Sequence, residues 1–309
     1  MQIKITKNKE EANLITHNNK FHPDDVFSTV FLSKYIDNPV LYRTNVGEVD
    51  APNAIVYDVG FGKFDHHGVD AKYRPNSKLK YCSFGLLWTE YGKDYLTKNN
   101  YEYVDELYTA IEEKLVKQID GIDNGIFPTI KAEYSLLDLD HIIDLFNPTW
   151  EEQNVDTDLY FERALITAEI IFDNLLKSEY AKIKATKKVA TLIDNVQDNI
   201  LILDEYLPYQ DAIFTSTNPK AKEIKIIILP SNRGGYNVKP ITISRESKEL
   251  LINFPSKYFG LHDEELANIS GIKTAKFVHL SGFLASTETL EDAILLAKQA
   301  LNNPENNID

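Results

Sequence analysis

Short apolar segments alternate with a helical pattern over the first 60 residues, and this alternation is the strongest constraint on the fold. LITH at 14–17 is followed by a helical pattern at 24–35 and then by NAIVYDVG at 53–60. A strand–helix–strand order is typical of βαβ units, whose strands lie parallel in one sheet. The sequence therefore predicts an α/β fold built on a parallel sheet.

The remainder of the chain predicts a long helix and a second, smaller domain. The pattern at 104–119 is helical, and 157–190 reads as a longer helix without glycine or proline. Beyond it, IKIIIL at 224–229 suits a buried strand and RGG at 233–235 suits a hairpin turn. A chain of 309 residues favours two domains over one. We expect a metal-binding α/β domain at 1–155, a helical connector at 156–190, and a smaller α/β domain at 191–309 with a frayed polar end.

The charge balance limits the partners of the chain. It has 47 acidic and 33 basic side chains, a formal net charge of −14, which argues against a long basic groove that follows many phosphates. The single cysteine, Cys82, cannot form an internal disulfide, and the N-terminus lacks the pattern of a secretory signal. No apolar run approaches the roughly 18 residues of a membrane span. We therefore expect a cytoplasmic protein that does not contact a membrane.

Histidine and aspartate gather near the ends of the predicted strands. Four of the seven histidines lie in the first 67 residues, in the segments THNNKFHPDD at 16–25 and FDHHG at 64–68. Between them VYDVG places Asp58 after an apolar run, and QIDGIDNG supplies Asp120 and Asp123. In an open α/β sheet, ligands bind outside the carboxyl ends of the strands, so these groups are expected to converge.

Such a cluster predicts divalent cations. Several carboxylates in one pocket carry more negative charge than it tolerates uncompensated. With this many ligands, two ions that share a carboxylate are expected, as in sites that activate water and stabilise phosphoryl oxygens. Nitrogen and oxygen ligands without thiolate favour Mn²⁺, with Mg²⁺, Fe²⁺ or Zn²⁺ as alternatives.

Each residue also has a structural interpretation. A single His–Asp pair is more often a hydrogen-bonded pair than a metal site. The alternative for Asp120 and Asp123 is that they end a helix and form a turn. Asp25 is better explained by the first turn of a helix, where it complements the helix dipole.

The motifs together resemble the DHH phosphoesterase superfamily, which is named for the triplet found here at 65–67. THNNKFHPDDVFS, VYDVG, FDHH, SFGLLW and IDGIDNGI are similar, more closely, to the Myg-type exonuclease family, and GLHDEELANISGIKTAKFVHLSGFLAST at 260–287 resembles its C-terminal segment. The resemblance spans nearly the whole chain. It implies a parallel-sheet metal domain with a smaller C-terminal domain, and its eukaryotic members are implicated in 3′–5′ RNA exonuclease activity.

The resemblance also implies roles for individual residues. The implied metal ligands are His17, His22, Asp24, Asp58, His66 and Asp120, with Asp58 bridging two ions. His67 would face the scissile phosphate, and Asp65 would orient the neighbouring imidazoles. The family's usual glycine in the first motif is Asn19 here. The candidates for its glycine-rich substrate loop are Arg233, Gly234 and Gly235, and alternatively His279, Ser281 and Gly282, although both sets also suit ordinary turns.

These expectations combine into a functional hypothesis. We expect a metal-dependent phosphodiesterase, a 3′–5′ exonuclease on RNA or short oligonucleotides, in which His67 or Arg233 offsets charge on the phosphoryl oxygens. One alternative is a phosphatase or pyrophosphatase that acts on a small phosphate compound. Another is a non-catalytic metal-binding module. The expected partner is a short single-stranded nucleic acid or a nucleotide, and a homodimer is possible.

Overall fold

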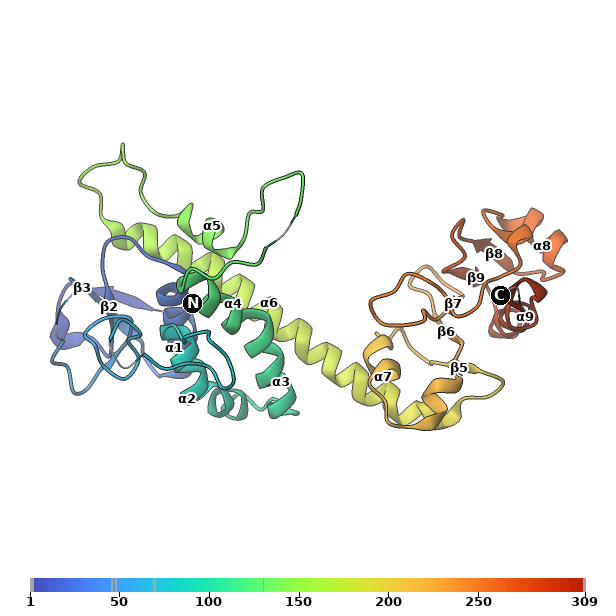
Figure 1. Cartoon of the computed structure of the whole chain (residues 1–309), viewed down its shortest axis with the longest axis horizontal. Helices are drawn as coiled ribbons and strands as arrows, with labels where there is room; N and C mark the ends of the chain where they lie inside the picture. The colour runs from blue at the N-terminus through green and yellow to red at the C-terminus, as the bar shows by residue number, and fades with distance from the viewer. Residues whose placement is uncertain (1–2, 46, 48, 69–70, 130, 308–309) are drawn as a thin grey trace. The chain divides into compact units, whose positions relative to one another are not determined.

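The chain forms two compact units that meet inside one long helix. The computed structural model describes residues 3–45, 47, 49–68, 71–129 and 131–307. The N-terminal unit comprises Met1–Tyr180 and the C-terminal unit Ala181–Asp309. The boundary falls within helix α6 (Thr157–Leu192), inside the segment predicted as a connector (Figure 1).

The N-terminal unit contains the predicted parallel sheet. Its four strands lie in the order β1-β3-β2-β4, and all three pairings are parallel. The strands are β1 (Lys4–Thr6), β2 (Leu14–His17), β3 (Val40–Thr44) and β4 (Ile55–Val56). The strand expected at 53–60 is shorter than its apolar run, because the backbone turns at Asp58, which has a φ of 54°.

Helices supply most of the core of this unit. Helix α1 (Pro23–Tyr35) is buried from residue 23 to residue 32, and it packs against β2 and α2 (Ser83–Lys98). Buried aromatic rings fill the interior, as in the edge-to-face contacts of Phe31 with Trp88 and Phe172. The remaining elements are η1 (Lys9–Glu11), α3 (Val104–Ile111), the π-helical segment η2 (Glu112–Val116), α4 (Lys117–Asp123) and α5 (Leu139–Asp144).

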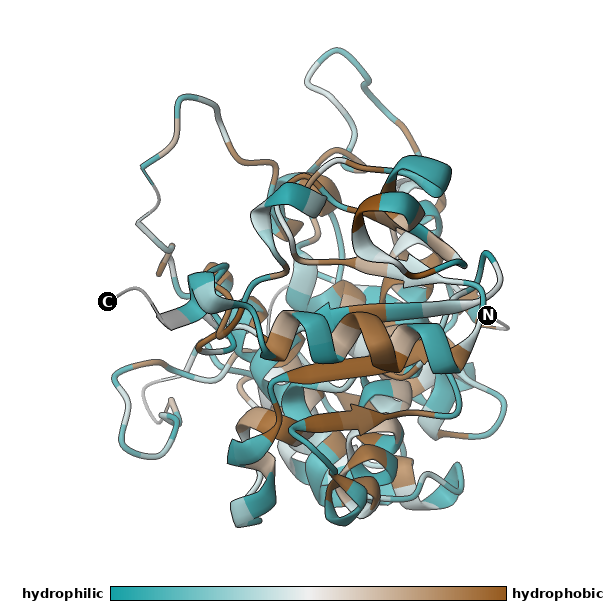
Figure 2. Ribbon diagram, turned by 90° about the vertical axis from the view of Figure 1, so that its right-hand side faces the viewer, coloured by the Kyte–Doolittle hydropathy of each residue, from teal (hydrophilic) through white to brown (hydrophobic). Residues whose placement is uncertain are grey.

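The C-terminal unit contains a mixed five-stranded sheet in the order β5-β6-β7-β9-β8. Its strands are β5 (Ile200–Ile202), β6 (Ile226–Pro230), β7 (Tyr236–Pro240), β8 (Ala275–Val278) and β9 (Ala285–Thr287). Alternate residues of β6 enter two different cores, Ile226 and Ile228 on one face and Ile227 and Leu229 on the other. Strands coloured brown for hydrophobic residues accordingly lie among helices with teal outer residues (Figure 2). The hairpin predicted around 233–235 is confirmed by the antiparallel pairing of β6 with β7.

The helices that lie wholly in this unit are short apart from α9 (Leu290–Leu301). The others are η3 (Ile193–Asn195), α7 (Gln210–Phe214), η4 (Pro219–Glu223), η5 (Ser256–Tyr258), α8 (Asp263–Ser270) and η6 (Pro304–Asn307). The expectation of a frayed end is wrong for 302–307, because Glu305 accepts hydrogen bonds from Ser256 and Asn303 is buried. Residues 308 and 309 lie outside the described part. Among the described residues, no helix is both long enough and apolar enough to cross a bilayer.

Candidate metal centre

Histidine and aspartate side chains from four parts of the N-terminal unit meet at one place. They come from the end of β2, the start of α1, the segment after β4, and the end of α4. Three groups have ligand atoms within 4.8 Å of one another: His17, Asp25 and Asp58; Asp58, His66 and His67; and Asp24, His66 and Asp123. Asp58 belongs to two groups and His66 belongs to two. The expected convergence at the carboxyl ends of the strands is therefore present in the structure.

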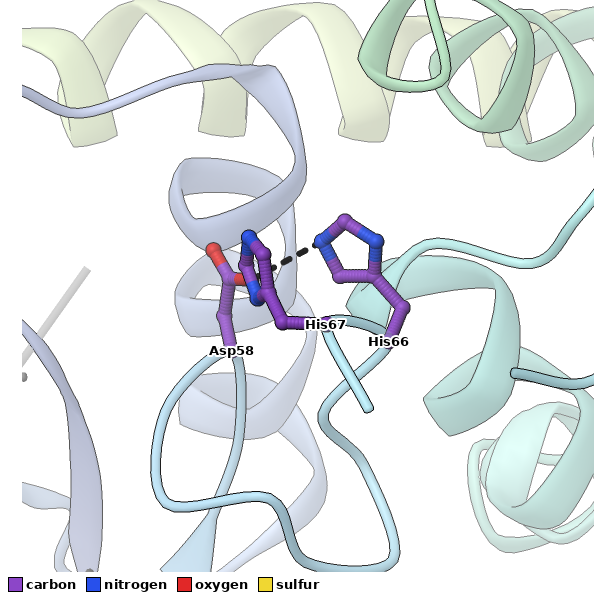
Figure 3. A group of neighbouring side chains, drawn as sticks. All are labelled: Asp58, His66 and His67. Atoms are coloured by element: carbon purple, nitrogen blue, oxygen red, sulfur yellow. Dashed lines mark hydrogen bonds and ion pairs between the residues drawn. The ribbon is translucent and has the colours of Figure 1, made fainter. Parts of the chain in front are cut away.

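The carboxylate of Asp58 lies at the middle of the cluster. Its Oδ2 is 3.2 Å from Nε2 of His17, and its Oδ1 is 3.1 Å from Nε2 of His66. Nδ1 of His67 lies 3.6 Å from the same Oδ1, and both imidazoles are turned toward Asp58 in Figure 3. One carboxylate thus faces a different imidazole with each oxygen, which is the arrangement expected of a ligand shared by two ions.

Helix α1 brings two buried aspartates to the cluster through its first turn. Oδ2 of Asp24 is 3.6 Å from Nε2 of His66, and Oδ2 of Asp25 is 3.4 Å from Nε2 of His17. The other oxygen of Asp25 accepts a hydrogen bond from the backbone N–H of His22, the residue that precedes the helix. Asp25 therefore lies in the first turn of the helix, as its structural interpretation stated, and there it caps the helix with one oxygen and presents the other to the cluster.

His22 lies beside this cluster without joining one of the three groups. Its ring centroid is 6.2 Å from that of His17, and it lines the same cavity. His22 is exposed and occupies the residue before α1, where its backbone is extended.

Asp123, rather than Asp120, reaches the imidazoles. Oδ2 of Asp123 is 3.2 Å from Nε2 of His66. Asp120, one turn earlier in α4, accepts hydrogen bonds from Nε of Arg74 and from the backbone N–H of Cys82. The placement of Asp120 therefore differs from that expected of a ligand, because the buried guanidinium of Arg74 and the backbone at the start of α2 occupy both of its oxygens.

Within the DHH triplet at 65–67, Asp65 holds the side chain and backbone of His67 in place. Oδ1 of Asp65 lies 2.8 Å from Nδ1 of His67 and accepts the backbone N–H of the same residue. Its Oδ2 accepts the backbone N–H of Phe61. Asp65 therefore contacts His67 directly, as expected of a residue that orients the imidazole, and it also closes the loop that follows Asp58.

A second set of contacts holds the loop that follows β2. The guanidinium of Arg43 donates to the backbone carbonyls of His17 and Asn19 and pairs with Asp158 at 3.1 Å. Asn147 exchanges two hydrogen bonds with the backbone of Phe21. Asn19 has a φ of 64°, a left-handed conformation that glycine and asparagine adopt most readily, which explains an asparagine at the usual position of a glycine.

The pKa values of the clustered side chains are strongly shifted by burial and by the neighbouring charges. Burial raises the pKa of Asp25 to about 7 and that of Asp123 to about 6. Burial also raises the pKa of Asp24 well above its usual range. The pKa of Asp58 lies well below its usual range, because hydrogen bonds to His17 and His66 outweigh its burial. The pKa of His17 rises to about 9, since Asp58 and Asp25 outweigh the opposing effect of burial.

These residues fit divalent cations. Both carboxylate oxygens of Asp24, and Oδ2 of Asp25 and of Asp123, are buried without a hydrogen-bond partner. A buried oxygen of this kind costs free energy unless a cation or donor satisfies it. Imidazole nitrogens and carboxylate oxygens are ligands that first-row divalent metals accept. The cavity above them, of about 840 Å³, is lined by His17, His22, Asp58, His66, His67 and Asp123 among others.

The two candidate substrate turns of the C-terminal unit lie at opposite ends of its sheet. Arg233, Gly234 and Gly235 form the turn before Tyr236, and Tyr236 pairs with Thr287. His279, Ser281 and Gly282 form the turn after Val278, which pairs with Ala285 at the other end of β9. The structure therefore does not bring the two sets together.

Each turn also has a structural role. Gly235 has a φ of 70°, and a Cβ there would collide with the backbone carbonyl of Thr287. In the other turn, the backbone N–H of Ser281 donates to Nδ1 of His279, whose ring centroid lies 4.3 Å from that of Phe283. Tight packing alone thus accounts for a glycine at 235, and ring and backbone contacts occupy His279.

A comparison with known families classifies the chain. The model of the MYG1 exonuclease family, described as an uncharacterised protein family (UPF0160), matches residues 13–301. The chain belongs to this family. Its relatives include the MYG1 protein of Dictyostelium discoideum, 28% identical over 94% of this chain and 97% of that protein. The human MYG1 exonuclease is 26% identical over 93% of this chain and 85% of its own length.

A solved structure also matches along the chain. The pGpG-specific phosphodiesterase PggH from Vibrio cholerae covers 93% of this chain and 97% of its own, with 13% identity and a TM-score of 0.32. At this TM-score the likeness supports no conclusion about the present molecule. The family assignment therefore depends on the sequence matches.

Proposed function

We propose that the N-terminal unit is a metal-dependent phosphodiesterase. The observation that carries this proposal is the Asp58 carboxylate, whose two oxygens face His17 and His66 within a set of unpartnered buried carboxylates. The name exonuclease, given to family relatives from mouse and human, supports the same class of reaction. The placement of the chain in the wider DHH superfamily is part of this proposal.

The residues that would hold the cations follow from the three groups. One ion would be held by His17, Asp25 and Asp58, and the other by Asp24, Asp58, His66 and Asp123. Bound divalent cations supply Lewis-acid polarisation of the phosphoryl group and lower the pKa of coordinated water. We propose Mn²⁺ as the native ion, because the ligands combine imidazole and carboxylate without thiolate.

We propose that His67 acts on the substrate. Its side chain is about half exposed in the cavity wall, and its pKa is raised by the hydrogen bond to Asp65. Asp65 itself has a lowered pKa, because the hydrogen bonds from His67 and Phe61 outweigh its burial. A protonated His67 would donate to a phosphoryl oxygen and offset the negative charge that develops there.

For the substrate we propose short single-stranded RNA, shortened from the 3′ end. The formal net charge of −14 favours a short nucleic acid over a long one that must follow a basic groove. The C-terminal unit would contribute substrate contacts through one of its two candidate turns. A small phosphate compound is the alternative that the same charge allows.

The decisive experiment compares the wild type with Asp58→Asn. We expect metal-free protein to be inactive, and we expect Mn²⁺ to restore the stepwise release of mononucleotides from a labelled RNA oligomer. The rate of this release should be more than about 100-fold lower in Asp58→Asn than in the wild type. Asp94→Asn is the matched control, because Asp94 contacts Tyr35 and Lys98 at the surface. Undiminished cleavage by Asp58→Asn would exclude this centre, and activity restricted to pyrophosphate would indicate the small-substrate alternative.

A further inference from the structure

The metal cavity continues into two neighbouring cavities. It shares Phe61, Asp65 and His67 with a cavity of about 530 Å³. It shares Asn19 and Lys20 with another of about 660 Å³. The two neighbours have no lining residue in common, so they adjoin the metal cavity at different residues. The three adjoining cavities together are called the groove.

Phe61 lies where the first neighbouring cavity meets the metal cavity. Its side chain is 61% exposed, and its φ of 55° is a left-handed conformation that is rare for a bulky residue. The hydrogen bond from its backbone N–H to Asp65 holds this conformation. A strained and exposed aromatic residue contributes little to packing, so its position is better explained by a ligand.

A second exposed aromatic residue, Trp150, lines the other neighbouring cavity but not the metal cavity itself. It lines the 660 Å³ cavity and is 85% exposed, next to Pro148 and Leu145. The loop that carries it is ordered by Glu152, which accepts hydrogen bonds from the backbone and hydroxyl of Thr149. An aromatic ring is thus presented to solvent on each side of the metal cluster.

Lysine side chains accompany both rings. Lys20 lies where the metal cavity meets the Trp150 side, and Lys63 and Lys72 line the Phe61 side. Lys20 pairs with Asp144 at 2.9 Å and Lys63 with Glu90 at 2.6 Å. Both pairs are exposed, so each contributes little to stability and a phosphate can replace the carboxylate at small cost. Planar aromatic surfaces and cations around a metal cluster match the alternation of bases and phosphates in a nucleic acid strand.

We propose that this groove binds a single-stranded oligonucleotide across the metal centre. One base beside the scissile phosphate stacks on Phe61, and a base on the other side stacks on Trp150. The flanking phosphates contact Lys20, Lys63 and Lys72. This inference rests on the proposed function and extends it, because it requires a substrate with bases on both sides of the cleaved bond. Stacking accepts any base, so little sequence preference is expected.

Direct binding tests the inference without turnover. The metal-free full-length chain, which should not turn over, is titrated with a fluorescein-labelled single-stranded RNA decamer, and the dissociation constant is measured by anisotropy. We expect Phe61→Ala and Trp150→Ala each to raise it about 10-fold, the scale of one lost stacking contact. Phe61→Tyr and Trp150→Phe should restore binding, since both keep an aromatic ring. Tyr134→Ala is the matched control, because Tyr134 is 73% exposed and lines none of the three cavities.

Intrinsic fluorescence gives a second measurement. The chain has two tryptophans, and Trp88 is fully buried, so quenching of emission by unlabelled RNA reports on Trp150. An unchanged melting temperature shows that each variant is folded. Loss of affinity at only one position, or at neither, overturns the inference. If RNA binding requires both rings but the wild type cleaves no RNA, the inference about the groove stands and the proposed function is refuted.

Discussion

At the scale of single residues, the two oxygens of one carboxylate can serve different partners. Asp25 caps α1 with Oδ1 and faces His17 with Oδ2. Reasoning from the sequence treated a first-turn helix position and a ligand role as competing explanations for Asp25, whereas the geometry satisfies both. The first turn of a helix that starts beside a cluster allows this double use, and two adjacent aspartates after a proline are the signal that could have indicated it.

The choice between Asp120 and Asp123 could not be made from the local sequence. The two residues are three positions apart in α4, so both lie on the same side of the helix. Arg74 decides between them, since its guanidinium comes from a loop remote in sequence and engages Asp120. Only the tertiary structure reveals that contact.

This difference predicts opposite behaviour for two similar variants. Asp123→Asn should retain or slightly raise the stability of metal-free protein, because it removes a carboxylate whose charged form burial disfavours, and it should weaken Mn²⁺ binding at least about 10-fold. Asp120→Asn should lower the free energy of unfolding by about 3 kcal/mol, since the buried Arg74 loses a charged partner. Urea unfolding with and without Mn²⁺, together with calorimetric titration, measures both effects. Equal Mn²⁺ affinities in the two variants would argue against our assignment.

At the scale of elements, the order of strands and helices was predictable, but the π-helical segment that divides the helix expected at 104–119 was not. The parallel pairing of β2 with β3 and β4 follows from the alternation of apolar and helical segments. The helix expected at 104–119 is instead α3, the π segment η2 and α4. A π segment changes the rotation of the following helix, and no residue pattern at 112–116 indicates it. The direction in which Asp120 and Asp123 point therefore required the structure.

Close packing of α2 on α4 gives a prediction at this scale. A Cβ at Gly85 would collide with the carboxylate of Asp120, whereas one at Gly62 would meet no atom within 4 Å. Gly85→Ala should cost about 1–3 kcal/mol of stability and reduce the Mn²⁺-induced rise in melting temperature, because α4 also carries Asp123. Thermal melts of both variants, with and without Mn²⁺, provide the comparison. If Gly85→Ala has the same melting temperature as Gly62→Ala, α4 can move to accommodate the added methyl group without loss of stability.

At the scale of the whole molecule, the division into two units was predictable from the length and from the change of texture after the long helix. The position of the boundary inside α6, at Tyr180, was not, because the helical pattern is continuous there. Likewise the candidate substrate turns could be identified as glycine-rich segments, but their placement at opposite ends of one sheet depends on strand order. Strand order of a mixed sheet is fixed by long-range packing.

The raised pKa values in the metal cluster predict how the stability of the protein depends on pH. The folded-state pKa values of Asp25 (about 7) and Asp123 (about 6) exceed the ordinary 3.8, and that of His17 (about 9) exceeds 6.5. Because protonation of these groups stabilises the folded state, the stability of metal-free protein should fall as pH rises from about 4 to 9. Mn²⁺ must displace these protons, so its affinity should rise about tenfold per pH unit for each proton released. Melting temperatures at pH 5.5 and 8 test this, and a metal-free protein more stable at pH 8 would contradict it.

The continuity of α6 determines which fragments of this protein can exist. At 36 residues the helix is about 54 Å long. Phe161, Leu165 and Phe172 on its first half are fully buried, with Phe161 against Phe21 and Phe172 against Phe31. A polypeptide truncated at residue 155 would lack the side chains that complete its own interior. Any evolutionary exchange of the metal-binding half between related genes would therefore have to carry most of the helix with it.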